Sequence, residues 1–226
     1  MIVIVDYGMG NLRSALRGIE KVGGEARIIQ SPREMIGADA IVLPGDGAFG
    51  HAMKNLREAG WVEPLKQACA DGVPFLGICV GMQLLFESSE ESRDIAALAQ
   101  TKTSALEEAM MAREGQHEGL GIFAGNVKRF PVGLKVPQMG WNQLNIRQSN
   151  PLLRDVPNGG YAYFVHSYYC APSDSSVTLA TTDYGVDFAS IVGRDNVWGT
   201  QFHPEKSQVV GLQILTNFVE LVKSKT

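Results

Sequence analysis

Cysteine is scarce in this sequence, and long apolar runs are missing from it. Three cysteines, Cys69, Cys79 and Cys170, occur among 226 residues, and an odd number cannot all pair. This argues against a disulfide framework and favours a reducing, cytoplasmic setting. The residues at 1–6 lack the charged start and longer apolar stretch of a secretory signal, and no run approaches membrane-spanning length.

An excess of basic charge is missing as well. The chain has 20 Lys and Arg against 24 Asp and Glu, a net charge of −4. Nucleic-acid-binding proteins usually carry a basic footprint, so nucleic acid is not an expected partner. The composition, 45% apolar and 19% charged, is ordinary for a folded domain, and the length suffices for one α/β domain with a sizeable core.

The first ninety residues alternate compact apolar runs with helical patterns. The runs lie at 2–5, 26–29, 40–43 and 74–78, each bounded by Gly, Pro or charge, as is typical of strands buried on both faces. Between the first two runs, residues 12–22 show helical spacing of leucine and isoleucine. Strand-helix-strand repetition predicts right-handed crossovers and a mostly parallel sheet covered on both sides.

The second half of the chain has a different pattern. Short runs follow one another with turns between them, which favours antiparallel hairpins. They lie at 127–130, 143–146, 161–169, 177–180, 188–192 and 197–201, and a helix is predicted at 207–222. With no internal repeat and no linker, residues 1–226 are predicted to form one domain.

Residues 88–118 stand apart by their charge. They hold seven acidic and three basic residues, and Ser104 and Glu107 have capping-box spacing. The pattern predicts an acidic surface insertion containing a short helix. A solvated insertion is the simpler interpretation, and a contact with a partner is the alternative.

The sequence Gly77-Ile78-Cys79-Val80-Gly81 carries the strongest chemical signal. It follows an apolar run and precedes a stretch, through Phe86, that has helical apolar spacing. Small residues beside a nucleophile suit a sharp strand-to-helix turn, which would expose the thiol at the carboxyl edge of the sheet. A helix N-terminus would favour the thiolate. A buried, inert cysteine is the alternative, and we favour it for Cys69 and Cys170.

A second signal is His203-Pro204-Glu205, where a strand is expected to end. A histidine beside a thiol can take its proton, and a carboxylate can orient the imidazole and stabilise its charged form. The order Cys, His, Glu along the chain is not diagnostic by itself. Alone, the pattern is a weak signal, and without Cys79 a solvent-facing turn would be the favoured interpretation.

The third signal is the glycine-rich turn Gly45-Asp46-Gly47, again after an apolar run. Attack of a thiolate on an amide creates an oxyanion that needs hydrogen-bond donors. The backbone amides of Asp46 and Val80 are our candidates, with an ordinary turn as the alternative. A phosphate loop would need a Gly-Lys-Ser/Thr sequence that is missing here.

A further glycine turn, Gly8-Met9-Gly10-Asn11, follows the first apolar run. A dinucleotide-binding fingerprint would place a third glycine at position 13, which is Arg13. We therefore expect no nucleotide cofactor.

Together these segments resemble the class I glutamine amidotransferases. More narrowly, motifs at 6–14, 77–86, 137–142, 164–168 and 200–207 resemble the glutaminase subunits of imidazole glycerol phosphate synthase in histidine biosynthesis. The resemblance implies a three-layer αβα, flavodoxin-like fold with a mostly parallel sheet and an antiparallel C-terminal part. It implies hydrolysis of glutamine to glutamate and ammonia without cofactor or metal.

The resemblance also implies a heterodimer. A (β/α)₈ cyclase subunit would receive the ammonia and form imidazole glycerol phosphate and an aminoimidazole carboxamide ribonucleotide. The alternatives are a glutaminase for another ammonia-using synthase, a catalytically silent interaction subunit, and a cysteine peptidase of similar fold.

The resemblance assigns a role to each of several residues. Cys79 would be the nucleophile, His203 its base and Glu205 the orienting carboxylate, with the oxyanion hole at Asp46 and Val80. Glutamine would contact Gly45, Gln83, Gln138 and Met139, and the partner would contact Asn11, Gln138 and Lys206. Asp46 and Gln138 depart from the family, which usually has Val and His there, and the 88–118 segment is longer than expected.

Overall fold

Five parallel strands form the centre of the molecule. The computed structural model describes residues 1–91 and 117–224. In space the five strands lie in the order β2 (Ala26–Ile29), β1 (Ile2–Val5), β3 (Ala40–Gly45), β4 (Phe75–Cys79) and β14 (Val197–Thr200). Every residue of β1, β3 and β4 is buried, which explains why these strands read as unbroken apolar runs.

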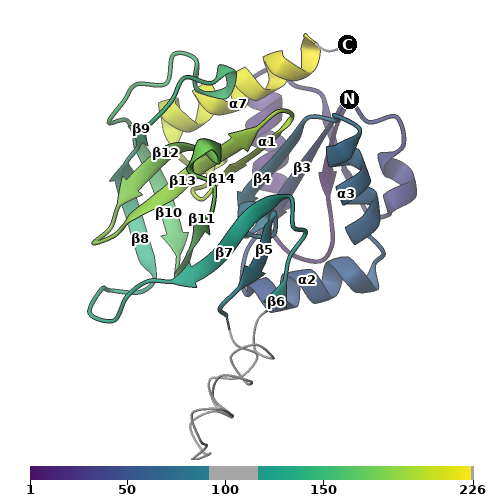
Figure 1. Cartoon of the computed structure of the whole chain (residues 1–226). Coiled ribbons are helices and arrows are strands. Elements are labelled where there is room, and N and C mark those ends of the chain that lie inside the picture. Colours follow the sequence, from purple (N-terminus) through teal and green to yellow (C-terminus); the bar gives the residue numbers. More distant parts are fainter. Residues whose placement is uncertain (92–116, 225–226) are drawn as a thin grey trace, which may run out of the picture.

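Helices cover both faces of this parallel block (Figure 1). Helices α1 (Leu12–Lys21) and α7 (Gln208–Lys223) pack together on one face, and α2 (Phe49–Glu58) and α3 (Val62–Ala70) lie on the other. Right-handed crossovers running in opposite directions from β1 and β3 produce this arrangement. The predicted three-layer α/β architecture is confirmed.

The sheet continues from β14 through mostly antiparallel strands. Its remaining order is β13 (Asp187–Arg194), β11 (Tyr168–Pro172), β7 (Phe123–Arg129), β5 (Phe86–Ser89) and β6 (His117–Glu118). Strand β12 (Thr178–Asp183) pairs with β13 and with the short β9 (Asn145–Ile146). The expected antiparallel C-terminal part is thus present, although β5 and β7 are parallel.

A separate two-stranded sheet joins β8 (Gln138–Gln143) and β10 (Tyr161–His166). The predicted single run at 161–169 is therefore wrong, because the chain leaves one sheet after His166 and enters the other at Tyr168. The run at 143–146 is wrong too: β8 ends at Gln143 and β9 begins at Asn145. Short 3₁₀ helices complete the fold: η1 (Pro32–Met35), η2 (Pro151–Leu153), η3 (Ser175–Val177) and η4 (Pro204–Lys206).

The predicted insertion at 88–118 begins and ends in paired strands. Ser88 pairs with Glu118 and Ser89 with His117, in antiparallel register. The part between them, residues 92–116, including the predicted capping box, lies outside the described residues. Whether residues 1–226 form one domain with this segment as an insertion stays a prediction.

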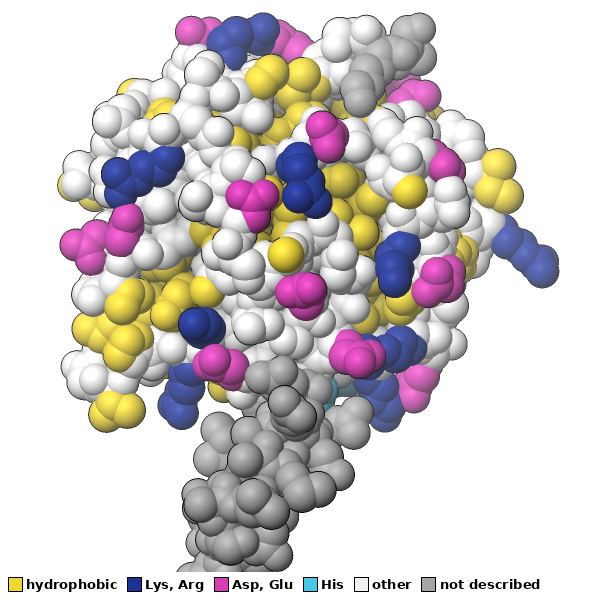
Figure 2. Space-filling model, in the orientation of Figure 1, with side chains coloured by type: hydrophobic (Ala, Val, Ile, Leu, Met, Phe, Trp, Pro, Cys, Tyr) yellow, Lys and Arg dark blue, Asp and Glu magenta, His cyan; other side chains and the backbone are white. Residues whose placement is uncertain are grey.

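Helix lengths and surface charge are defined for the part of the chain that the structure describes. Within residues 1–91 and 117–224, no helix is both long and apolar enough to cross a bilayer. On the face drawn in Figure 2, Lys and Arg side chains are interspersed with Asp and Glu, and neither sign forms a continuous patch.

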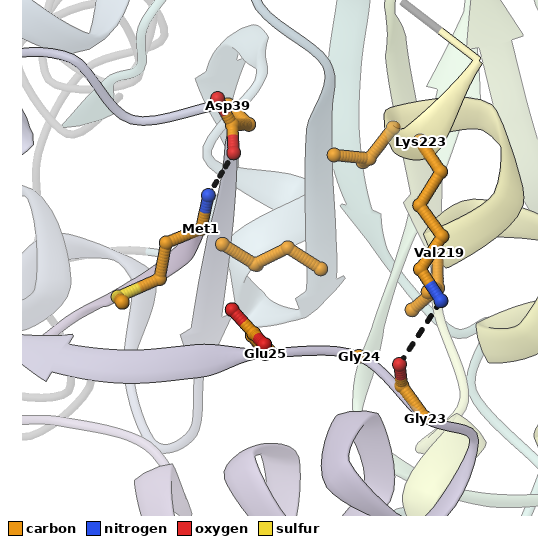
Figure 3. Close-up of a pocket in the computed structure, with 9 residues that line it drawn as sticks. Met1, Gly23, Gly24, Glu25, Asp39, Val219 and Lys223 are labelled. Carbon is orange, nitrogen blue, oxygen red and sulfur yellow. Dashed lines mark hydrogen bonds and ion pairs between the residues drawn. The ribbon is translucent and has the colours of Figure 1, made fainter. Parts of the chain in front are cut away.

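A small pocket of about 190 Å³ lies at the end of the sheet where the parallel strands begin (Figure 3). The amino group of Met1 pairs with Asp39 on one side, and Lys223 Nζ donates to the Gly23 carbonyl at 3.1 Å on the other. No cysteine or histidine lines it. It is remote from the opposite edge, where the candidate site lies.

Candidate active site

Three neighbouring strands end side by side at the carboxyl edge of the sheet. Gly45 of β3 lies opposite Cys79 of β4 in the parallel register. On the other side of β4, Thr200 of β14 lies opposite Ile78, so Gln201 follows level with Cys79. This register brings together the glycine turn, the cysteine turn and the His-Pro-Glu segment, which are far apart in the sequence.

The backbone at Cys79 makes the sharp turn that the sequence predicts. Cys79 has φ +56°, a left-handed conformation that costs a non-glycine residue about 1–3 kcal/mol. A Cβ added at Gly77 would lie 2.6 Å from the Gly81 carbonyl oxygen, and one at Gly81 would lie 1.8 Å from that of Leu43. Both glycines are therefore required by close backbone approach.

The helix after the turn is shorter than predicted. Helix α4 spans Val80–Gln83, and Phe86 begins strand β5. The apolar residues after Gln83 suit a buried strand as well as a helix, and Phe86 pairs with Phe123 of β7. A helix of a single turn has few aligned peptide dipoles, so stabilisation of a Cys79 thiolate depends mainly on nearby side chains.

His203 and Glu205 form a buried pair next to Cys79. The imidazole Nδ1 donates to Glu205 Oε1 at 3.0 Å, and the two side chains are only 7% and 3% exposed. Burial alone would lower the pKa of His203, but its hydrogen bonds and charge interactions with Cys79 and Glu205 outweigh burial and raise that pKa to about 9. The arrangement thus favours the charged form of the imidazole at neutral pH.

Helix α1 leaves room for the carboxylate. A Cβ added at Gly18 would come within 3.0 Å of Glu205 Cβ and of Leu215 Cδ1. Ser207 also holds the segment, because its hydroxyl donates to the His203 carbonyl at 2.7 Å and accepts from the Tyr163 N–H at 2.9 Å. Sequence reasoning missed Gly18, although a glycine inside a predicted helix was the available signal.

The pKa of His203 gives a prediction for Glu205→Gln. The carboxylate favours the charged imidazole, so its loss should lower the pKa of His203. A reaction that needs the imidazolium should decline as pH rises through about 9 in the wild type. In Glu205→Gln that decline should begin nearer neutrality, which pH profiles of turnover would detect. An unchanged alkaline limb would show that Glu205 does not tune the imidazole.

The glycine turn Gly45-Asp46-Gly47 faces the cysteine turn. A Cβ at Gly45 would lie 2.7 Å from the Gly81 nitrogen, and Gly47 has φ +73°. The Asp46 carboxylate accepts from the Gly10 N–H at 3.0 Å, which ties this turn to the loop after β1. The Asp46 side chain thus links the two loops, and the backbone amide of Asp46 remains a candidate donor.

A pocket of about 270 Å³ opens over Cys79. Asp46, Val80 and Gln83 line it, together with Val165, His166, Ser167, Tyr168 and His203. The Gln83 amide is nearly buried and donates to the Tyr168 carbonyl at 3.0 Å and to Gln201 Oε1 at 3.1 Å. The proposed nucleophile and its neighbours therefore meet in a space suited to a small amide.

Glu91 also lines this pocket and was missed by the sequence reasoning. Its Oε2 accepts from the Phe49 N–H at 2.5 Å, and burial raises the pKa of its carboxyl group. It fell inside the 88–118 segment, which was interpreted as a solvated insertion. A carboxylate here can pair with a substrate ammonium group.

The remaining predicted residues lie outside the immediate centre. Gln138 is 3% exposed and its Oε1 has no hydrogen-bond partner among the described residues, whereas neighbouring Met139 is 65% exposed. Asn11 caps α1 by accepting from the Ser14 N–H at 3.2 Å. Lys206 is exposed on η4, beside Glu205. A side chain as buried as Gln138 cannot contact a partner without movement of β8.

The other cysteines differ from Cys79 in their surroundings. Burial raises the pKa of Cys69 to about 12, and burial together with the nearby Cys79 raises the pKa of Cys170. Both are free thiols. Among residues 1–91 and 117–224, no cluster of three or more His, Cys, Asp or Glu side chains could hold a metal ion.

Comparisons with known proteins show the family of this chain. The family model described as glutamine amidotransferase class-I matches residues 3–221. The imidazole glycerol phosphate synthase subunit HisH of Syntrophotalea carbinolica is 49% identical over 228 residues, covering 98% of this chain and 100% of that protein. HisH of Desulfitobacterium hafniense strain Y51 is 47% identical over 218 residues, covering 96% and 93%.

Solved structures share the fold at low sequence identity. A crystal structure described as glutamine amidotransferase superposes with a TM-score of 0.69 at 19% identity, covering 99% of this chain and 100% of that one. PurLQS from Thermotoga maritima gives a TM-score of 0.68 at 15% identity, covering 99% and 97%.

Proposed function

Because this chain belongs to the class-I glutamine amidotransferases and, within them, to the HisH subunits of imidazole glycerol phosphate synthase, we propose that it hydrolyses glutamine for a synthase partner. The products are glutamate and ammonia. The observation that carries this proposal is the buried arrangement of Cys79, His203 and Glu205 beneath a pocket of amide size.

The chemistry follows from these positions. The Cys79 thiolate attacks the side-chain amide carbon of glutamine, and the resulting oxyanion accepts from the backbone amides of Asp46 and Val80. The His203 imidazolium then gives its proton to the leaving nitrogen, so that ammonia departs and a thioester remains. Water, deprotonated by the neutral imidazole, attacks the thioester and releases glutamate and the thiolate.

Recognition of glutamine engages both ends of the molecule. Gly45, Gln83 and the backbone at Gln138 and Met139 are the proposed contacts implied by the family resemblance. Glu91 adds a carboxylate at the pocket wall, where it would pair with the α-ammonium group. A charge-assisted hydrogen bond of this type is stronger than a neutral one.

We expect Glu91→Gln to weaken glutamine binding more than catalysis. Loss of one charge-assisted contact should raise KM for glutamine about tenfold and leave kcat within about threefold. Steady-state kinetics at saturating partner would measure both. Glu90→Gln, a neighbouring exposed carboxylate, is the matched control and should leave both constants unchanged. A KM effect of equal size in the two variants would contradict the assignment.

A partner surface is supported by exposed side chains near the site. Met139, Trp141 and Tyr161 on the two-stranded sheet are 65%, 45% and 54% exposed, although they are large and apolar. Such groups favour a protein interface. Nearby, Arg17 and Lys21 of α1 and Lys206 of η4 line a cavity of about 330 Å³. The basic side chains suit an acidic edge on a partner.

The proposed partner is the (β/α)₈ cyclase subunit, which would use the ammonia to make imidazole glycerol phosphate and an aminoimidazole carboxamide ribonucleotide. Asn11, Lys206 and, after movement of β8, Gln138 are the proposed contacts. The HisH relatives are themselves named as subunits of this synthase. A reducing, cytoplasmic setting remains the expectation that accompanies this role.

The test compares glutamine hydrolysis by the isolated chain, by its mixture with the cyclase, and by that mixture with the nucleotide substrate. The peptide between Gly45 and Asp46 is flanked by glycine, so it can flip at small steric cost. We propose that in the isolated chain its N–H points away from the position of the oxyanion. One missing oxyanion donor costs about 10²–10³ in rate. We therefore expect activation of this size.

The control is the same mixture containing ammonium salt in place of glutamine, which bypasses this subunit. Rates that agree within about threefold in the isolated chain and in both mixtures would refute activation by the partner. Glutamine hydrolysis without imidazole glycerol phosphate formation, while ammonium salt supports it, would favour a glutaminase for a different synthase.

A further inference from the structure

Gln201 is completely buried beside the reactive sulfur, and the chemistry above gives it no role. It follows β14 directly and lies level with Cys79 across the sheet. Its Nε2 is 3.8 Å from Cys79 Sγ, within reach of an N–H···S hydrogen bond. A buried amide that close to a nucleophile needs an explanation.

The orientation of the Gln201 amide is fixed by its neighbours. Gln83 Nε2 donates to Gln201 Oε1 at 3.1 Å, so that oxygen must be the acceptor and the NH₂ group must face the sulfur. The Gln83 amide is itself held, because it also donates to the Tyr168 carbonyl at 3.0 Å. Two linked amides thus run from the pocket wall to Cys79.

A second contact of the Cys79 sulfur, with a backbone carbonyl, favours the neutral thiol. The Val165 carbonyl lies 4.0 Å from Cys79 Sγ, where it can accept from a neutral S–H group but only repel a thiolate. The Gln201 N–H, in contrast, stabilises a thiolate by donating to it. Because Cys79 is 3% exposed, water contributes little, and a buried anion without donors is costly.

We propose that Gln201 is a positioning residue for the thiolate: its amide, oriented by Gln83, donates to Cys79 and holds the sulfur ionised and directed into the pocket. This inference deepens the proposed function and rests on Cys79 being its nucleophile. His203 supplies the charge that balances the thiolate, and Gln201, two residues earlier in the segment after β14, supplies a neutral donor. The two contributions are distinct, because only His203 exchanges a proton.

The test replaces Gln201 with methionine, which has a similar length and no N–H. The readout is the rate at which iodoacetamide alkylates Cys79, measured across pH in the full chain and located by peptide mapping. We expect the midpoint of the alkylation profile to rise by about one pH unit, so that the rate falls about tenfold at pH values below the wild-type midpoint. With the partner present, kcat for glutamine should fall about tenfold while KM changes less than about threefold.

The titratable groups that act on Cys79 stay in place in this variant. They are Tyr7 after β1, Cys170 on β11 and His203, with Asp46 acting on Tyr7. Asn196→Leu is the matched control, because it also removes a buried amide, whose Nδ2 donates to the Cys69 and Val73 carbonyls away from the thiol. It should lower the melting temperature and leave the alkylation profile unchanged.

An alkylation profile of Gln201→Met that coincides with the wild type would overturn the proposal, as would an equal shift in Asn196→Leu. If circular dichroism shows that Gln201→Met does not fold, Gln83→Leu provides the second test. It keeps Gln201 but removes the donor that orients it, while His166 Nδ1 still donates to the Tyr168 carbonyl at 2.8 Å. We expect about threefold slower alkylation at pH values below the wild-type midpoint; an unchanged rate would also overturn the proposal.

The alkylation readout separates this inference from the proposed function. The alkylation rate depends on the Cys79 thiolate and does not require hydrolysis of glutamine. A shifted profile in a chain that hydrolyses no glutamine with the cyclase would refute the function and leave the role of Gln201 intact.

Discussion

Replacing Cys79 with serine is expected to reduce glutamine hydrolysis by at least about a thousandfold while the protein stays folded. Serine is nearly isosteric, and the neighbouring glycines leave the turn unaltered. Its hydroxyl is a far weaker nucleophile at neutral pH, because it does not ionise there as a thiol beside an imidazolium does. Glutamate release by the partner complex, with circular dichroism of the variant, would measure both parts of this expectation.

Cys69→Ser is the control for Cys79→Ser. Cys69 is buried on α3, and burial raises the pKa of its thiol to about 12, so it should be unreactive and its replacement should leave turnover unchanged. A glutamine-like electrophile should label Cys79 before Cys69 or Cys170. Peptide mapping that found the label mainly on another cysteine would refute the nucleophile assignment.

Replacing His203 with alanine should have an effect almost as large, about 10³-fold or more on kcat at neutral pH. The imidazole both balances the thiolate and protonates the leaving nitrogen, so its loss removes two functions at once. Alkylation of Cys79 at pH 7 should slow in parallel, because the thiolate loses its counter-charge. Turnover and alkylation would be measured on the same preparation.

Glu205→Gln is the comparison for this variant and should cost less. An amide can still accept from Nδ1 and orient the ring partly, although it cannot stabilise the imidazolium equally well. Equal or reversed losses in partner-activated turnover would mean that the base and the orienting group are wrongly assigned.

The parallel half of the fold was predictable because its central strands are buried on both faces. Strands β1 and β2 coincide with the predicted ranges, and β3 and β4 differ from theirs only at the ends. Strand β8 was not predicted as a whole, because its burial is the reverse of the usual pattern: Gln138 is buried, whereas Met139 and Trp141 are exposed. Local patterns report burial, and they do not report which sheet a strand joins.

In the candidate site, too, some residues were predictable from the sequence and others were not. The turn at Cys79 was predictable from glycine spacing, since Gly77 and Gly81 are required by local backbone approach. Glu91 and Gln201 were not, because their position depends on pairings with residues distant in the sequence. For Glu91 the acidic composition of residues 88–118 was misleading, since it suggested solvent exposure for every carboxylate in the segment.

The pairing of Ser89 with His117 also bears on how this protein can change in evolution. The chain leaves the sheet and returns to it at neighbouring backbone positions. The pairing of β5 with β6 therefore does not depend on the number of residues between them. The entropic cost of closing a loop grows slowly with loop length, by about 0.6 kcal/mol for each doubling. Lineages can therefore gain or lose sequence here at little cost to folding, provided that Glu91 keeps its place. The same junction would accept a grafted reporter domain, whose ends need only be close together.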